Sequence, residues 1–352
     1  MKNILLFSLS LIIIIGCSDN NSMETFYKFP ERIKLEGKET GVELHFKIAY
    51  LDVFYSFLLI TETHTKNTIH LHKKNSFDHI FSTGKIGRGP GEIERPGFYV
   101  FDKKEGILWT PDLADNKIIK WKIDSLIAKG KTYRPTVSYQ PPSCLWPTPS
   151  FSQLNDSTFL YRVQDNPDYY FYAANTKGKV IDSLNVKNKT KIYPDVNKKD
   201  LIATRWFHHI IHPTEKKIII AYRNSDIIVG IDFNGNILFQ RQGPDIIQES
   251  PTKNYMKRTY YSLRATKSHI LGLYKGGYVK KHPKDKPKYP ENIFVFDWQG
   301  KPIANLQLEH PTATFDIDKE NKKIITYAAD LGQIVTYDLP YMLDESSNKD
   351  NN

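Results

Sequence analysis

Residues 294–300, Phe-Val-Phe-Asp-Trp-Gln-Gly, hold the pattern that decides the fold. An alternating apolar strand ends at an aspartate, and the aspartate opens a short turn that closes on glycine. Alternation with a period of two indicates a half-buried β-strand, and Asp and Gly at these offsets favour a tight turn. The same unit occurs at residues 229–235, Val-Gly-Ile-Asp-Phe-Asn-Gly. A repeated strand-and-turn element is therefore expected.

The unit recurs six times along the chain. Its anchor, an Asp, Asn or His at the end of the apolar strand, is repeated with a mean spacing of about 53 residues, which is typical of propellers and solenoids. The six anchors are His72, Asp124, Asn175, Asp232, Asp297 and Asp338.

A second aligned position lies inside the units. His212 and Asp318 each precede their anchor by 20 residues and Asp102 precedes its anchor by 22, and each opens a polar turn before another apolar strand. The unit is thus four short strands separated by turns. Because four-stranded antiparallel sheets repeated radially make a propeller, we predict an all-β, six-bladed β-propeller. A two-domain β-sandwich and a different blade count are the alternatives.

The last unit is short of one strand. After Asp338, only residues 339–343 precede a polar tail, so the final blade is expected to lack its outer strand. Residues 31–36 or 42–48, which precede the first complete unit, would supply it. The ring is therefore expected to be closed by an N-terminal strand.

The connection after the first unit has its own signature. Residues 84–96, Gly-Lys-Ile-Gly-Arg-Gly-Pro-Gly-Glu-Ile-Glu-Arg-Pro, are followed by Phe-Asp at 101–102 and Asp-Asn-Lys-Ile at 115–118, and they are similar to the NHL-repeat pattern. Together with Phe-Asp-Trp-Gln-Gly at 296–300, they resemble the TolB-like six-bladed propeller lipoproteins of Bacteroidetes over about residues 40–340. The resemblance implies a fold rather than an activity. The glycines lack the Lys-Ser/Thr of a phosphate loop, so an inter-blade turn is expected.

The N-terminus has the layout of a signal peptide. Residues 4–15 are apolar and follow a single lysine, but a bilayer span needs about 20 apolar residues. Gly16 before Cys17 resembles the lipobox of bacterial lipoproteins, which implies cleavage between them and lipidation of Cys17. Ser18 in place of Asp favours the outer membrane, on either its periplasmic or its outer face.

These features divide the chain into four parts. We expect a signal peptide at 1–16, a lipidated cysteine and polar tether at 17–27, the propeller at 28–343 and a polar tail at 344–352.

Positive charge is concentrated in one segment. Residues 253–288 contain eleven Lys or Arg residues and one Asp, and their net charge of +10 equals the formal net charge of the whole chain. Five tyrosines are interleaved, and Tyr289 follows directly. This is either a solvated loop or a surface for anionic polymers or lipid head groups. Outside the cytoplasm, an acidic glycan is favoured over nucleic acid. The candidate residues are Lys257, Arg258, Tyr260, Tyr261, Arg264, Lys280, Lys281 and Lys284.

The sequence offers no convincing catalytic set. His208, His209 and His212 have zinc-ligand spacing on a helix, but their surroundings predict a strand, where neighbours point to opposite faces. No metal or cofactor is expected, no Gly-x-Ser-x-Gly elbow is present, and Cys144 is expected to be a buried apolar residue.

These expectations combine into one function. We predict a lipid-anchored extracytoplasmic binding or protein-interaction module at the outer membrane, with an outer-membrane protein or an anionic glycan as partner. The alternative is an extracytoplasmic hydrolase or lyase with its site at the propeller channel.

Overall fold

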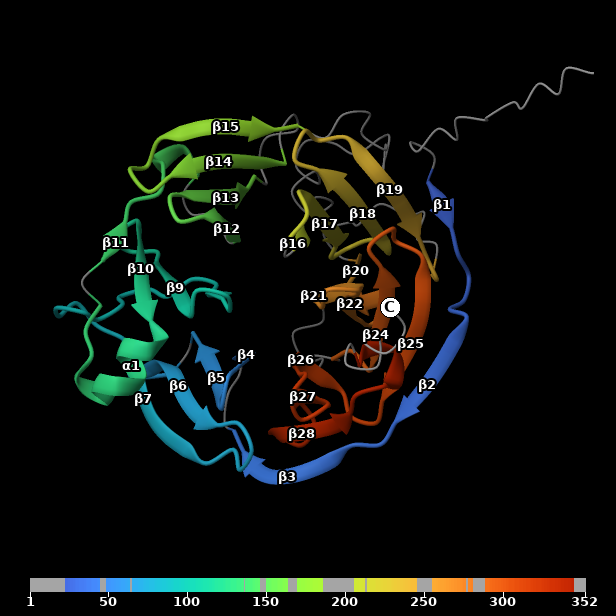
Figure 1. Ribbon diagram of the computed structural model, residues 1–352, viewed down its shortest axis with the longest axis horizontal. Coiled ribbons are helices and arrows are strands. Elements are labelled where there is room, and N and C mark those ends of the chain that lie inside the picture. Colours follow the sequence, from blue (N-terminus) through green and yellow to red (C-terminus); the bar gives the residue numbers. More distant parts are fainter. Residues whose placement is uncertain are drawn as a thin grey trace, which may run out of the picture.

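A computed structural model describes residues 23–44, 49–63, 65–135, 137–145, 150–163, 170–185, 206–212, 214–245, 255–276, 278–280 and 289–344. Six sheets stand around a central axis as the blades of a propeller, which confirms the predicted fold (Figure 1). The four principal strands of each blade are antiparallel neighbours, and the first of them lies nearest the axis.

The strands of the first three blades follow one another directly. Blade 1 contains β4 (Ala49–Phe54), β5 (Phe57–Glu62), β6 (Asn67–Lys73) and β7 (His79–Lys85). Blade 2 contains β8 (Val100–Asp102), β9 (Ile107–Asp112), β10 (Lys117–Lys122) and β11 (Ser138–Tyr139), with α1 (Ile123–Lys129) and a 3-10 turn (Gly130–Thr132) before β11. Blade 3 contains β12 (Phe151–Asn155), β13 (Thr158–Arg162), β14 (Phe171–Asn175) and β15 (Val180–Leu184), and is preceded by a 3-10 turn (Ser143–Leu145).

The last three blades also take strands from the N-terminus. Blade 4 contains β16 (Phe207–Ile211), β17 (Lys217–Tyr222), β18 (Ile227–Asp232), β19 (Ile237–Gln242) and β1 (Glu24–Thr25). Blade 5 contains β21 (Tyr260–Ala265), β22 (His269–Tyr274), β24 (Asn292–Asp297), β25 (Pro302–Leu308) and β2 (Glu31–Leu35). Blade 6 contains β26 (Thr312–Asp318), β27 (Lys323–Ala328), β28 (Gln333–Asp338) and β3 (Lys38–Glu43), with a 3-10 turn (Tyr341–Leu343) behind it.

The core lies between the blades. Each of the six joints between neighbouring blades holds an apolar cluster, such as Leu51 of blade 1 against Ile325 of blade 6. Both faces of a middle strand are therefore covered. This explains why β17 and β18 are continuous apolar runs instead of alternating ones.

The repeated anchor residues make the turns that separate the strands. In blades 3, 4 and 5 the anchor side chain accepts hydrogen bonds of 2.8–3.0 Å from the amides two and four residues later, and a glycine at positive φ completes the turn. The anchors with this geometry are Asn175, Asp232 and Asp297. Local side-chain hydrogen bonding is why Asn, Asp and Gly recur at these positions.

The earlier aligned position is also a turn cap. Oδ1 of Asp102 and of Asp318 accepts backbone amides three residues ahead. His212 does the same with Nδ1, which accepts the amide of Glu215 at 2.9 Å. The internal alignment of the units is thereby confirmed at atomic level.

An N-terminal segment closes the ring, as predicted, but with different bounds. Strand β3 pairs antiparallel with β28 as the outer strand of blade 6, and it coincides with neither predicted range. Residues 31–35 instead form β2, which pairs parallel with β25. Residues 24 and 25, expected in the tether, form β1 on β19. We call residues 24–43 the belt, because they follow the outer edges of blades 4, 5 and 6 (Figure 1).

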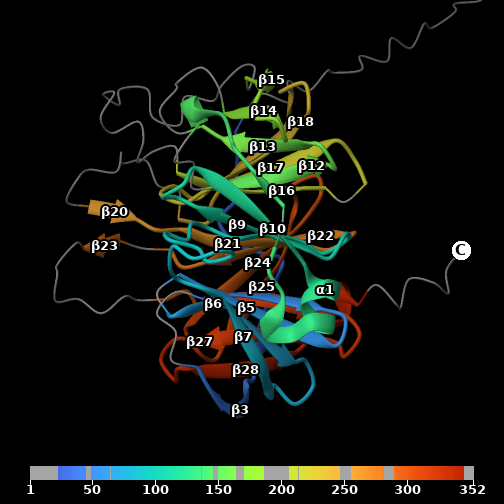
Figure 2. The same cartoon turned by 90° about the vertical axis from the view of Figure 1, so that its left-hand side faces the viewer.

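The two faces of the disc differ. Strands β20 (Tyr255–Lys257) and β23 (Tyr278–Lys280) pair with each other and extend the β21–β22 hairpin out of the disc on one side, which we call the hairpin face. Helix α1 lies toward the other side, the helix face (Figure 2). The connections between neighbouring blades, and the turns that join the second strand of a blade to the third, lie on the hairpin face. None of the helices that the structure describes is long and apolar enough to cross a membrane.

Candidate functional site

The centre of the propeller is held by a polar network. Arg264 of β21 donates from Nη2 to the carbonyl of Leu51 at 2.9 Å and lies 3.7 Å from Asp52 Oδ1. Its Nε lies 3.4 Å from Oδ1 of Asp316. Asp316 also accepts the amide of Val53 at 2.6 Å and pairs with Lys103. Residues of blades 1, 2, 5 and 6 are thus tied together across the channel.

Burial raises the pKa of one acid in this network. Desolvation raises the pKa of Asp52 from 3.8 to about 6, although Arg264 and Lys103 lower it. The two carboxylates and two cations balance in charge, so the network offers no net attraction for an ionic ligand. Its role in the fold is to join inner strands.

A different group of side chains lies at the hairpin-face end of the channel. Arg162 ends β13, Trp206 precedes β16, and Arg223 occupies the turn after β17. The guanidinium carbon of Arg223 lies 4.8 Å from the centre of the Trp206 ring, and that of Arg162 lies 5.9 Å from it. The Trp206 indole therefore makes cation–π contacts with two guanidinium groups.

Backbone contacts fix this arrangement. The amide of Arg223 donates to the carbonyl of Trp206 at 2.7 Å, and the amide of Thr259 donates to the carbonyl of Arg223 at 2.8 Å. Arg162 donates from Nη1 to the carbonyl of Phe207. The turns of blades 3, 4 and 5 are thereby joined at the mouth of the channel.

Positive charge dominates this end of the channel. Burial and then the charge of Arg223 lower the pKa of Arg162 from 12.5 to about 9. Burial and then the charge of Arg258 lower the pKa of Arg223. In the described part of the chain, no carboxylate lies within ion-pair distance of Arg223 or Arg258. We call Arg162, Trp206, Arg223 and Arg258 the arginine mouth.

The three histidines do not gather into one site. Burial and the charges of Arg223 and Arg162 hold the pKa of His208 well below its ordinary value. His209 bonds through Nε2 to Ser152 Oγ at 2.9 Å, and burial lowers its pKa to about 3. His212 caps its turn and packs on Trp298 at 4.1 Å between ring centres. Neighbouring residues on β16 thus serve different surroundings, as alternation requires.

His209 is no base for its serine partner at neutral pH. Because burial lowers its pKa to about 3, the imidazole is too weak a base to take the serine proton, and its buried Nδ1 has no hydrogen-bond partner among the described groups. A serine nucleophile needs a base whose other nitrogen is oriented by a third group. Among the residues described, no cluster of three or more His, Cys, Asp or Glu would hold a metal ion.

The structure separates the predicted basic residues. Arg258 lies at the arginine mouth, and Tyr261, also near it, packs against the apolar cluster between blades 5 and 6. Tyr260 is fully buried, and Arg264 belongs to the central network, so neither is part of an exposed surface. Lys257 and Lys280 lie in β20 and β23, but their side chains are outside the described set. Lys281, Lys284 and Cys17 also lie outside it, as does the side chain of Cys144.

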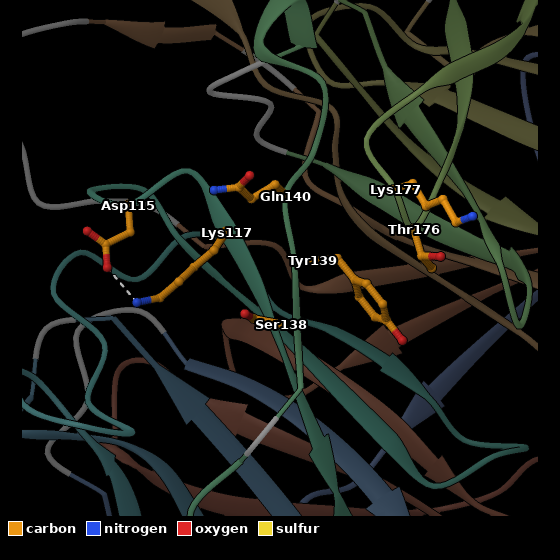
Figure 3. Close-up of a pocket in the computed structure, with 7 residues that line it drawn as sticks. All are labelled: Asp115, Lys117, Ser138, Tyr139, Gln140, Thr176 and Lys177. Atoms are coloured by element: carbon orange, nitrogen blue, oxygen red, sulfur yellow. Dashed lines mark hydrogen bonds and ion pairs between the residues drawn. The ribbon is translucent and has the colours of Figure 1, made fainter.

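Two open pockets lie at the outer rim. One, of about 640 Å³, is formed between blades 2 and 3, and its Lys117 is already paired with Asp115 at 2.5 Å (Figure 3). The other, of about 560 Å³, adjoins the glycine-rich connection, where Glu92 accepts from Lys85 at 2.6 Å and from the amide of Gly89 at 2.8 Å. With Gly91 at φ 76°, this connection is the predicted inter-blade turn.

Of the arginine mouth, Arg258 was predicted from the sequence, whereas Arg162, Trp206 and Arg223 were missed. Arg162 and Arg223 stand alone at strand ends in segments without a charge run. Their positions in the repeat were the available signal, because both lie at the end of the second strand of a unit and so reach the same face.

Comparisons with known proteins agree with this architecture. Residues 25–320 match the model of the family described as TolB-like 6-blade propeller-like. A member of the DUF4221 family from Bacteroides vulgatus ATCC 8482 is similar in structure, with a TM-score of 0.57, 9% identity and coverage of 89% of this chain and 97% of that chain. A putative exported protein from Bacteroides fragilis NCTC 9343 has a TM-score of 0.51, 14% identity and coverage of 90% and 98%. None of the curated proteins matches the chain.

Proposed function

The chain belongs to the TolB-like family of six-bladed propellers, and from that premise we propose that it is a lipid-anchored extracytoplasmic binding module at the outer membrane. The hairpin face is its binding surface. An outer-membrane protein or an anionic glycan is the partner.

The arginine mouth is the observation that carries this proposal. Blades 3, 4 and 5 bring three guanidinium groups and an indole to one end of the channel, on the face from which the basic hairpin projects. Loops placed by a rigid scaffold are where binding residues concentrate. Like charges held together destabilise a protein on its own, so their retention favours a role in binding.

The proposed anchor rests on the sequence and is compatible with the fold. Gly16 and Cys17 supply the lipobox pattern, and an attached acyl chain contributes about 0.8 kcal/mol for each CH₂ buried in the bilayer. The belt begins at Glu24 on the outer edge of blade 4, seven positions after Cys17. A tether that precedes Glu24 therefore joins the propeller at the outer edge of blade 4.

Crosslinking in the native host tests the binding function. The full-length protein is compared with a hairpin variant, Lys280→Glu/Lys281→Glu/Lys284→Glu, and with a matched helix-face variant, Lys104→Glu/Lys122→Glu/Lys129→Glu, whose lysines are exposed. We expect a partner to be recovered with wild type and the helix-face variant and lost from the hairpin variant. Equal recovery from all three would contradict the assignment of the face.

Membrane fractionation tests the anchor. Cys17→Ala is expected to leave the outer-membrane fraction and to lose acyl labelling, whereas Cys144→Ala keeps both. Retention of acyl label in Cys17→Ala would refute lipidation at that residue.

A further inference from the structure

We propose that the arginine mouth binds the carboxylate of an acidic oligosaccharide, which enters the channel from the hairpin face. This inference rests on the proposed binding function and names the chemistry of its ligand. Arg223 and Arg258 are the principal charge partners, with Arg162 beside them.

The first support is the geometry of the guanidinium groups. Arg162 and Arg223 stand 5.9 and 4.8 Å from one Trp206 ring, which holds both planar groups in place on an aromatic surface. Arginine binds carboxylates through two parallel N–H bonds, and a stacked guanidinium loses little further freedom when it does so. The site is therefore organised before a ligand arrives.

The second support is uncompensated charge. Elsewhere, half-buried arginines of this protein have acid partners: Arg241 lies 3.0 Å from Glu24, and Arg264 faces Asp52 and Asp316. The described residues provide no such partner for Arg223 or Arg258. Burial and then repulsion from Arg258 lower the pKa of Arg223, and an incoming anion would offset both effects.

The third support is the set of side chains that lie beneath the arginine mouth, deeper in the channel. His208 lies among the charges of Arg162, Arg223 and Arg264 as a neutral imidazole, and its buried Nε2 has no hydrogen-bond partner in the described part of the chain. It would give a ligand oxygen a neutral contact. Deeper in the channel, the carboxylates of Asp52 and Asp316 are already paired with Arg264 and Lys103, so this charge-balanced network adds no attraction for an anion. A terminal carboxylate fits this arrangement better than a polymer threaded through the ring.

Aromatic side chains around the mouth favour a sugar as the carrier. The rings of Tyr50, Tyr261 and Tyr289 are half-buried and lie close enough to Arg223 or Arg258 to affect, or be affected by, their charge. Aromatic rings combine an apolar face with a polar tip and suit ligands that carry both C–H surfaces and hydroxyl groups. We therefore choose a uronate-containing oligosaccharide over a simple phosphate.

Calorimetric titration of the full-length lipoprotein in a non-ionic detergent tests the proposal. The probes are tetragalacturonate, the neutral galactose tetrasaccharide and inorganic phosphate. We expect binding of tetragalacturonate that weakens steeply with salt, and no binding of the neutral tetrasaccharide. Binding of phosphate without tetragalacturonate, or equal binding of both tetrasaccharides, would overturn the assignment.

Variants locate the site. Arg223→Gln and Arg258→Gln should each weaken tetragalacturonate binding by about tenfold or more, since a hydrogen bond to a charged group is lost. Arg241→Gln is the matched control, because its guanidinium also stacks on a ring, Phe239 at 5.7 Å, but far out in blade 4 and paired with Glu24. Unchanged affinity in Arg223→Gln and Arg258→Gln would refute the proposal.

Two measurements distinguish an error in the carboxylate site from loss of folding and from an error in the proposed binding function. Arg223→Gln should melt at or above the wild-type temperature, because it removes repulsion, so lost binding is not lost folding. If tetragalacturonate does not bind while crosslinking still captures a partner at the hairpin face, the carboxylate site is wrong and the binding function stands.

Discussion

Replacing Lys74 with Met tests whether a buried ion pair holds the joint at which the ring closes. Lys74 follows β6 in blade 1, and its side chain is only 3% exposed. Its Nζ lies 3.1 Å from Oδ1 of Asp318 at the end of β26 in blade 6 and 2.6 Å from Oε2 of Glu320. The side chain of Asp318 is equally buried, whereas that of Glu320 is 77% exposed. The joint thus depends on one buried pair and one exposed partner.

The expected loss in the free energy of unfolding follows from this burial. Removing one partner of a buried ion pair costs about 3–5 kcal/mol, because the other charge is left buried. Asp318 keeps hydrogen bonds from Asn321, so we expect the lower end, about 3 kcal/mol. For a propeller of roughly 320 residues, unfolding entropy near 2.1 cal/mol/K per residue converts this into a fall in Tm of about 4 °C.

Thermal melting by circular dichroism at pH 7 measures the effect. The Glu320 and Asp318 carboxylates hold the pKa of Lys74 above its ordinary value against desolvation, so its contribution is present at pH 7 and is lost only above pH 10.5. Glu320→Gln is the control and should cost less than about 1 kcal/mol, because its partner is exposed. Lys74→Met/Asp318→Asn should recover most of the loss. Equal melting temperatures for Lys74→Met and Glu320→Gln would refute the reasoning.

Three further predictions concern the network, the belt and a turn. Because burial raises the pKa of Asp52 to about 6, the folded state binds its proton more tightly than the unfolded state, and wild type should gain up to about 3 kcal/mol relative to Asp52→Asn between pH 7.5 and pH 4; urea titrations with equal gains in both proteins would contradict this. Gly243→Ala should free the start of the belt, because a Cβ would lie 2.0 Å from the carbonyl oxygen of Phe26, and limited proteolysis should then cut before residue 31. In the control Gly130→Ala the backbone is strained at φ 55°, but the new Cβ meets no atom within 4 Å and lies in blade 2, so the belt should stay resistant. His212→Ala should lower the free energy of unfolding by about 1–2 kcal/mol, because it removes the acceptor for two backbone amides. His212→Asp should lower it less, because Asp102 and Asp318 cap the equivalent turns. Equal Tm values for the two variants would show that the cap is unimportant.

The sequence was most informative where structure is local. Asn175, Asp232 and Asp297 bond to amides within four residues, so their turns could be inferred from short motifs. His212 could be aligned with Asp102 and Asp318 for the same reason. The bounds of β3 could not be inferred, because its place is set by pairing with β28 at the other end of the chain.

The number of basic residues in a segment does not predict where each side chain lies. Arg258 and Arg264 lie in one basic segment, yet one lies at the channel mouth and the other is paired inside the ring with carboxylates of blades 1 and 6. A side chain's face depends on register, and the bulge after Tyr260 shifts that register within β21. The arginine mouth required coordinates because its members come from three blades.

The belt also dictates an order of folding. Lys38 contacts Thr336 across 298 positions of sequence, and Glu24 and Glu31 pair with strands of blades 4 and 5. A chain that emerges from its N-terminus must therefore keep residues 24–43 unpaired until the last blades exist. Contacts of such long range make folding slow and expose strand edges to misassembly in the meantime. We therefore expect the pairing of β3 with β28, which closes the ring, to be the last step of folding.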